Sequence, residues 1–115
     1  MKDINGKILY KDKEYVFIFN LNVMEEIQEE YGSIEKWVEL TSGVDGESNI
    51  KALIFGYTVM LNEQIDIDNE ENGTDTKPLT KKFVGRMLSE YGILNATDKL
   101  HTTINDSTQS EEKNV

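Results

Sequence analysis

The carboxylates between residues 63 and 75 have the spacing that comes nearest to a metal-binding motif. The segment holds six acidic residues and no basic one. Counted as an EF-hand loop, it has suitable residues at four positions, which are Asp68, Glu70, Asn72 and Gly73. The glutamate that should hold calcium with both oxygens at the end of such a loop is replaced by Leu79. We therefore expect a solvated, mobile loop, with a weak calcium site at 66–76 as the alternative.

A second acidic group has helical spacing. Glu25 and Glu29 are four residues apart, as are Glu26 and Glu30, so each pair repels on a helix face. A carboxylate-bridged metal site would add a histidine three residues after a glutamate, and the sequence has no such pair. We expect a solvated face, and the alternative is an electrostatic docking face for a basic partner.

Other residue types needed for catalysis are missing or isolated. The chain has no cysteine, and its one histidine, His101, has no histidine or cysteine to share a metal with. Gly43 and Gly46 are not followed by the Lys and Ser or Thr of a phosphate-binding loop. We predict that the protein is not an enzyme and uses no metal or cofactor.

The charge and the length exclude further classes. Twelve basic and 22 acidic side chains give a formal net charge of −10, which is the wrong sign for binding nucleic acid. The N-terminus lacks the apolar run of a signal peptide, and no apolar stretch is long enough to span a bilayer. With 115 residues, we expect one soluble domain in the cytoplasm that binds neither nucleic acid nor membrane.

The elements that must position these residues begin with a predicted β-hairpin. Residues 7–10 and 15–19 are runs of β-branched and aromatic residues, separated by the polar residues 11–14. Both faces of the second run are apolar, so the strand must be covered on both sides. A lone hairpin is marginally stable in water, and helices are therefore expected to pack on it.

Capping residues and apolar stripes of helical period predict the rest. The expected helix starts are Asn22, Ser33, Ser48 or Asn49, and Thr80, the expected stops include Gly32 and Gly92, and 41–46 is a loop. A weaker last helix carries Ala96, Leu100 and Ile104. The predicted fold class is α+β, mainly α, with an N-terminal β-hairpin followed by four or five short packed helices. Residues 1–105 form one globular domain, and 106–115 a disordered polar tail.

The helix that ends near Leu61 is apolar almost all round. Leu53 and Tyr57 belong to one stripe, and Phe55 and Val59 belong to a second. Such a helix is either central or has an interface on its far side. We predict that Trp37, Phe55 and Val59 bind a partner or a second copy of the chain, and simple core packing is the alternative.

Three segments together suggest a family. These are Phe17-Ile18-Phe19-Asn20-Leu21-Asn22-Val23-Met24-Glu25-Glu26-Ile27 with Glu29-Glu30-Tyr31-Gly32-Ser33, the stretch 49–56, and Leu79-Thr80 leading into Phe83-Val84-Gly85 and Met87-Leu88. In this order they resemble the strand-to-helix opening, central helix and late Leu-Thr helix start of bacteriophage tail assembly chaperones. The resemblance spans about residues 5 to 105. Lys81 and Lys82 depart from it, since acidic residues usually follow the Leu-Thr pair.

The resemblance implies a phage or prophage protein that works without catalysis. Such a chaperone binds the long tape-measure protein, helps to recruit tail-tube subunits, acts in the host cytoplasm and is absent from the mature virion. The family is often also made as a longer frameshifted form. The alternative function is an acidic inhibitor that mimics nucleic-acid charge at a basic protein site, and it requires carboxylates aligned on a rigid surface.

Overall fold

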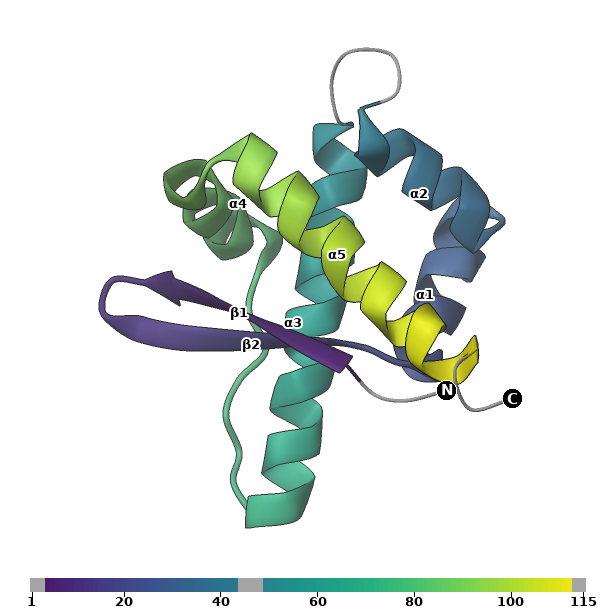
Figure 1. Ribbon diagram of the computed structural model, residues 1–115. Coiled ribbons are helices and arrows are strands. Elements are labelled where there is room, and N and C mark those ends of the chain that lie inside the picture. The colour runs from purple at the N-terminus through teal and green to yellow at the C-terminus, as the bar shows by residue number, and fades with distance from the viewer. Residues whose placement is uncertain (1–3, 44–48, 113–115) are drawn as a thin grey trace.

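The structure, a computed structural model, describes residues 4–43 and 49–112 (Figure 1). Its elements are β1 (Ile4–Tyr10), β2 (Lys13–Phe19), α1 (Leu21–Tyr31), α2 (Ile34–Ser42), α3 (Ile50–Asn72), α4 (Lys81–Tyr91) and α5 (Ile93–Glu112). The predicted fold class, α+β and mainly α with an N-terminal hairpin, is confirmed. Two of the helices are longer than predicted, because α3 has 23 residues and α5 has 20.

Two predicted boundaries fall partly outside the described residues. The tail predicted for 106–115 overlaps α5, whose backbone is helical to Glu112, and residues 113–115 are not described. The domain boundary at 105 therefore stays a prediction. In the loop predicted for 41–46, Thr41 and Ser42 belong to α2 and Gly43 ends that helix, whereas residues 44–46 lie outside the described part.

The hairpin is a two-stranded antiparallel sheet with a tight turn. Lys11 and Asp12 have φ angles of 50° and 63°, and two positive values in succession are typical of a type I′ turn. The connection is thus two residues rather than the predicted four, because the twist of this turn matches that of the strands. Phe17, Ile18 and Phe19 on β2 are all buried, which confirms that both faces of the strand are covered.

Side-chain caps fix the helix starts. Ser33, Asn49 and Thr80 accept hydrogen bonds from the N–H groups of Lys36, Ala52 and Phe83 at 3.0, 2.9 and 3.1 Å. These three predicted caps are confirmed. The prediction for Asn22 is wrong, because Asn20 is the first residue after β2 and its Oδ1 accepts from Val23 N–H at 3.1 Å.

The core is built around the first half of α3 (Figure 1). Tyr57 packs edge-on against Phe17, with 5.0 Å between ring centroids, and its hydroxyl donates to a carbonyl of α5 at 2.6 Å. Burial raises the pKa of this phenol far above its ordinary value. Trp37 is fully buried, and its Nε1 donates to a carbonyl of α3 at 3.0 Å. A Cβ at Gly56 would overlap the indole ring, so the glycine makes room for it.

The acidic segment 63–75 is helical over most of its length. The prediction of a mobile loop is wrong, because α3 continues without a break to Asn72 and ends at Gly73. Asp68 and Glu70 therefore lie on a straight helix, where side chains cannot wrap around a cation as an EF-hand loop does. The lower half of α3 extends beyond the hairpin, and the chain returns alongside it (Figure 1).

Two asparagines attach the returning chain, residues 73–80, which we call the strap. Asn62 accepts from Leu79 N–H at 2.7 Å and donates to its carbonyl at 3.1 Å. Asn69 likewise accepts from Thr76 N–H at 3.0 Å and donates to its carbonyl at 2.9 Å. Asn62 and Asn69 are about two helical turns apart, so both amides face the strap. Hydrogen bonds to the backbone thus support a helix half that has few buried side chains.

Candidate functional site

The three predicted binding residues lie in two different environments. Trp37 is fully buried beneath α3, so the prediction that it binds a partner is wrong for the folded chain. The physical reason is Gly56, which lets the indole approach the helix backbone and complete the core. Phe55 and Val59 are half-buried, pack at the edge of the core and line one groove together. The geometry therefore keeps two of the three residues at a surface.

The groove with Phe55 and Val59 lies between α1, α3 and the start of α4. Its volume is about 230 Å³. It is lined by Glu26, Phe55, Thr58, Val59, Asn62, Glu63, Asp66 and Lys81, and we call it the acidic groove. An apolar floor surrounded by three carboxylates suits a ligand with an apolar group and a neighbouring cation.

Aromatic contacts hold Phe55 in place. The Phe55 ring meets Tyr31 edge-on, with 5.5 Å between centroids. Lys81 Nζ lies 5.4 Å from the centroid of the same ring, within the range of a cation–π interaction. Partial burial and, to a smaller extent, Glu30 raise the pKa of the Tyr31 hydroxyl. Phe55 is thus a fixed contact surface with a cation of the protein's own beside it.

The carboxylates of this groove differ in how they are held. Glu63 Oε2 accepts from Asn20 Nδ2 at 2.7 Å and from Asn22 Nδ2 at 2.9 Å. These bonds fix its position and join α3 to the start of α1. Partial burial raises the pKa of Glu26, and the negative charges of Glu63 and Asp66 raise it further. The groove therefore concentrates negative charge that a bound cation would relieve.

A second groove, which we did not predict from the sequence, has an apolar lining. It has a volume of about 310 Å³ and is lined by Ile50, Leu53, Ile54, Gly85, Leu88, Ser89 and Ile93. We call it the apolar groove. Ile50 and Ile93 are 51% and 41% exposed, and Leu94, which follows Ile93, is 78% exposed. The available signal was the pair of small residues Gly85 and Ser89, four apart on α4.

The other residues considered for chemistry are dispersed. Of the four glutamates of α1, Glu25, Glu29 and Glu30 are exposed outside the grooves, whereas Glu26 lines the acidic groove. His101 is half-buried, and its Nε2 lies 3.2 Å from the Thr41 hydroxyl. Within residues 4–43 and 49–112, no three His, Asp or Glu side chains are grouped to hold a metal ion. None of the described helices is both long and apolar enough to cross a membrane.

Two surfaces available for function are therefore the grooves that border α4, with apolar side chains in both and a carboxylate rim on one of them. Their geometry suits contact with another polypeptide. Comparisons of the chain with models of protein families, with curated proteins and with solved structures found no match.

Proposed function

We propose that the protein is a non-catalytic tail assembly chaperone of a phage or prophage, which binds the tape-measure protein and helps to recruit tail-tube subunits. The observation that carries this proposal is the pair of grooves bordering α4, where apolar side chains stay partly exposed although the core is complete. The resemblance described above supplies the identity of the client. The client is held in the host cytoplasm and released before the virion is mature.

The two grooves suit a helical client. An amphipathic helix docks by placing apolar residues from one face into an apolar groove. Ile50 and Ile93 offer apolar surface at one groove, and Phe55 and Val59 offer it at the other. The carboxylates of the acidic groove favour a client helix with lysine or arginine beside its apolar face. The net charge of −10 keeps a protein with such surfaces soluble.

The proposal is tested by co-expressing the chain with the neighbouring gene for a long helical protein and measuring how much of that protein is captured. Ile93→Glu is expected to reduce capture at least fivefold, because Ile93 lines the apolar groove and is 41% exposed. The matched control is Leu21→Glu, because Leu21 is 69% exposed, also lies in the first turn of a helix and lines neither groove. Both substitutions place a carboxylate where the helix dipole tolerates it.

The acidic groove has its own variant in this experiment. Val59→Asp adds a negative charge to the apolar floor and is expected to reduce capture, whereas Phe55 is less suitable because it also supports Tyr31. Circular dichroism verifies that each variant is folded. Failure of the unmodified chain to capture the helical neighbour would refute the chaperone function. Equal capture by Ile93→Glu and Leu21→Glu would instead exclude the apolar groove.

A second candidate, the acidic inhibitor, is favoured by one observation. The carboxylates of the second half of α3 lie on a helix attached to the strap, so they have the fixed arrangement that charge mimicry requires. This function predicts a complex with a nucleic-acid enzyme that dissociates as salt rises from 0.05 to about 0.5 M. A complex that persists at high salt favours the chaperone, because apolar contacts are not screened.

A further inference from the structure

One edge of the hairpin is open to pairing. β2 is hydrogen-bonded to β1 and to no other strand of the described residues. Tyr10 and Lys13 flank the two-residue turn and form its closing, hydrogen-bonded pair. Hydrogen-bonded and non-hydrogen-bonded pairs alternate along an antiparallel ladder, so Glu14 and Val16 belong to non-hydrogen-bonded pairs. The backbone N–H and C=O groups of Glu14 and Val16 therefore point away from β1. Within 4–43 and 49–112, these groups make no backbone hydrogen bond outside the ladder.

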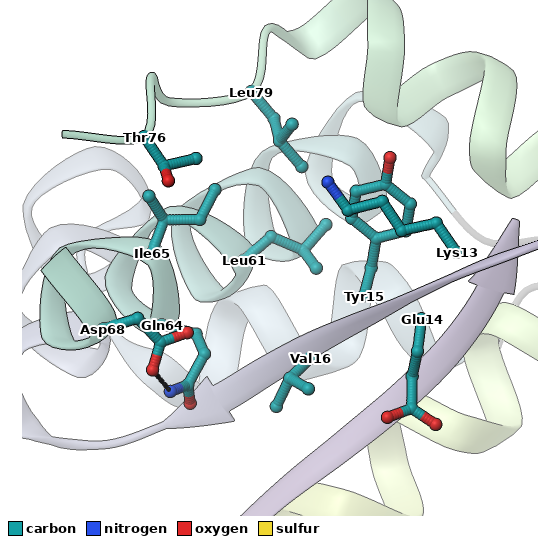
Figure 2. Close-up of a pocket in the computed structure, with 10 residues that line it drawn as sticks. All are labelled: Lys13, Glu14, Tyr15, Val16, Leu61, Gln64, Ile65, Asp68, Thr76 and Leu79. Carbon is teal, nitrogen blue, oxygen red and sulfur yellow. Dashed lines mark hydrogen bonds between the residues drawn. The ribbon is translucent and has the colours of Figure 1, made fainter. Parts of the chain in front are cut away.

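A pocket of about 270 Å³ lies at this edge (Figure 2). It is lined by Lys13, Glu14, Tyr15 and Val16 of β2, by Leu61, Gln64, Ile65 and Asp68 of α3, and by Thr76 and Leu79 of the strap. We call it the edge pocket. No residue of β1 lines it, so it lies on the unpaired side of β2. The strand edge, the protruding half of α3 and the strap thus form three walls around an apolar interior.

One residue of the pocket lining has a hydrogen-bond acceptor without a partner. Gln64 Nε2 donates to Asp68 Oδ1 at 3.0 Å, but Gln64 Oε1 is buried and has no partner. Buried acceptors are nearly always paired, and an unpaired one is costly. Because this oxygen is buried, a bound segment could reach it only if the amide turned toward the pocket. The open strand edge therefore remains the reason to expect a polypeptide in the pocket.

Charge selects the occupant. Asp68 and Glu14 line the pocket, and Glu70 and Glu71 follow Asp68 on α3. Glu14 also forms an exposed ion pair with Lys7, with 3.7 Å between Glu14 Oε1 and Lys7 Nζ, so Asp68 is the main carboxylate that attracts a basic segment. Lys13 is the basic residue in the lining, and its Nζ lies 5.2 Å from the Tyr15 ring centroid. A second copy of this chain brings a net charge of −10 and is repelled. A segment with lysine or arginine is attracted to the same carboxylates.

We propose that the edge pocket binds an extended, basic segment of a partner protein, which adds as a third strand to β2. The segment pairs its backbone with Glu14 and Val16 and places an apolar side chain against Leu61 and Leu79. A lysine or arginine of the segment lies next to Asp68. The site is separate from the two grooves bordering α4, and it stands whether or not the client proposed above is correct.

The test uses a synthetic peptide of alternating lysine and valine, with a glutamate–valine peptide of equal length as its counterpart. In amide NMR spectra, the lysine peptide is expected to shift Glu14 and Val16, together with residues 61–68 of α3. The glutamate peptide is expected to bind at least tenfold more weakly. Peptide-induced shifts confined to other surfaces, or equal binding of both peptides, would overturn the proposal.

Two proline variants separate this edge from the opposite one. Val16→Pro removes an N–H that faces the pocket and takes no part in the β1–β2 ladder. Leu9→Pro is the matched control, because Leu9 is directly opposite Glu14 and its N–H faces away from β2. Val16→Pro is expected to weaken binding of the lysine peptide at least tenfold, and Leu9→Pro less than twofold. Equal weakening by both variants contradicts strand addition at β2.

A third variant tests the charge without touching the strand. Asp68→Lys changes an exposed side chain on the protruding half of α3 and is expected to reverse the preference, so that the glutamate peptide binds more tightly. An unchanged preference for the lysine peptide refutes the assigned role of Asp68. Dimerisation of the free protein through β2, detected by sedimentation and by shifts of the Glu14 and Val16 amides with concentration, would identify a second copy as the occupant and overturn the proposal.

Discussion

The two halves of α3 belong to one continuous helix but are held in different ways. The half that ends at Leu61 is enclosed by the core, and Ala52, Leu53, Gly56, Tyr57, Thr58, Met60 and Leu61 are buried. The half from Asn62 to Asn72 extends beyond the core, carries five carboxylates and is attached to the strap by two asparagine side chains. Burial of apolar side chains holds the first half in place, and a few hydrogen bonds to the strap hold the second half in place.

The two halves therefore have different roles: the first stabilises the fold, and the second presents charged side chains at the surface. The buried half supplies most of the apolar area that stabilises the fold, so its residues have little freedom to change. The protruding half contributes the acidic rims of the acidic groove and of the edge pocket. A helix that begins in the core and ends outside it thus places charged side chains at a distance from the core without a flexible connection.

The largest effect is expected in the buried half. Trp37→Ala removes a fully buried ring and its hydrogen bond to α3, and should lower the free energy of unfolding by about 3–5 kcal/mol. Urea denaturation followed by circular dichroism measures the change. Ile50→Ala is the control, because Ile50 is in the same half of α3 but is 51% exposed, and it should cost about 1 kcal/mol or less. Equal costs would show that burial does not distinguish these positions.

The asparagine clamps should give the next largest effect. Asn62→Ala removes two hydrogen bonds from a half-buried site and should cost about 1–2 kcal/mol. Asn69→Ala removes its bonds to the strap at an exposed site, where water replaces them, and should cost about 0.5–1 kcal/mol.

A local measurement distinguishes the clamps from the core. Hydrogen exchange should accelerate in residues 66–80 of both asparagine variants and stay unchanged in 52–60. Uniform acceleration along the whole of α3 would contradict the division into two halves, since it would mean that the helix opens as one cooperative unit.

The same division explains what the sequence could predict. Apolar periodicity and caps located the buried half of α3, α4 and the stripe of Ala96, Leu100 and Ile104, because core burial leaves a regular pattern. The protruding half has no apolar stripe, and its support depends on Asn62 and Asn69 reaching a strap that ends eleven residues after Asn69. No local sequence pattern encodes that pairing. The many carboxylates and the Asn72-Gly73 pair therefore led to the prediction of a loop.

The candidate site was only half predictable for a related reason. Phe55 and Val59 were assigned to a surface because they form a second stripe, and they do line the acidic groove. Trp37 was misplaced because its burial depends on Gly56, which is nineteen residues away in the sequence and has no side chain to signal the contact. The apolar groove was missed because it combines residues of α3, α4 and α5, each ordinary in its own helix.

A smaller effect is expected at the end of the protruding half. α3 has no basic residue in its last turn, where Glu70 and Glu71 oppose the helix dipole. Glu71→Lys should raise the free energy of unfolding by about 0.3–1 kcal/mol at low salt, and 0.5 M salt should remove most of the gain. Glu71→Gln is the control for loss of charge alone. No stabilisation by either variant would mean that the end of α3 opens before the protein unfolds globally.

The smallest effect lies where the two halves meet, at the acidic groove. Since partial burial, Glu63 and Asp66 raise the pKa of Glu26 in the folded protein, the ionised form of Glu26 is disfavoured by folding. Stability linked to Glu26 is therefore fully present below its ordinary pKa of about 4.5 and falls as the pH rises through the higher folded value. Glu26→Gln should stabilise the protein slightly at pH 7, by less than Glu71→Lys.

The pH dependence makes the test of Glu26 specific. The gain from Glu26→Gln should disappear below about pH 4, because Glu26 is then protonated in both the folded and the unfolded chain. Glu25→Gln on the same exposed face is the control and should show a smaller gain at pH 7. A gain from Glu26→Gln that persists at pH 3.5 would mean that packing, rather than charge, is responsible. If Glu26→Gln stabilises the protein but weakens binding of a basic client, the charge of Glu26 serves binding at a cost in stability. The acidic groove, where the two halves of α3 meet, is then a site at which function lowers the free energy of unfolding.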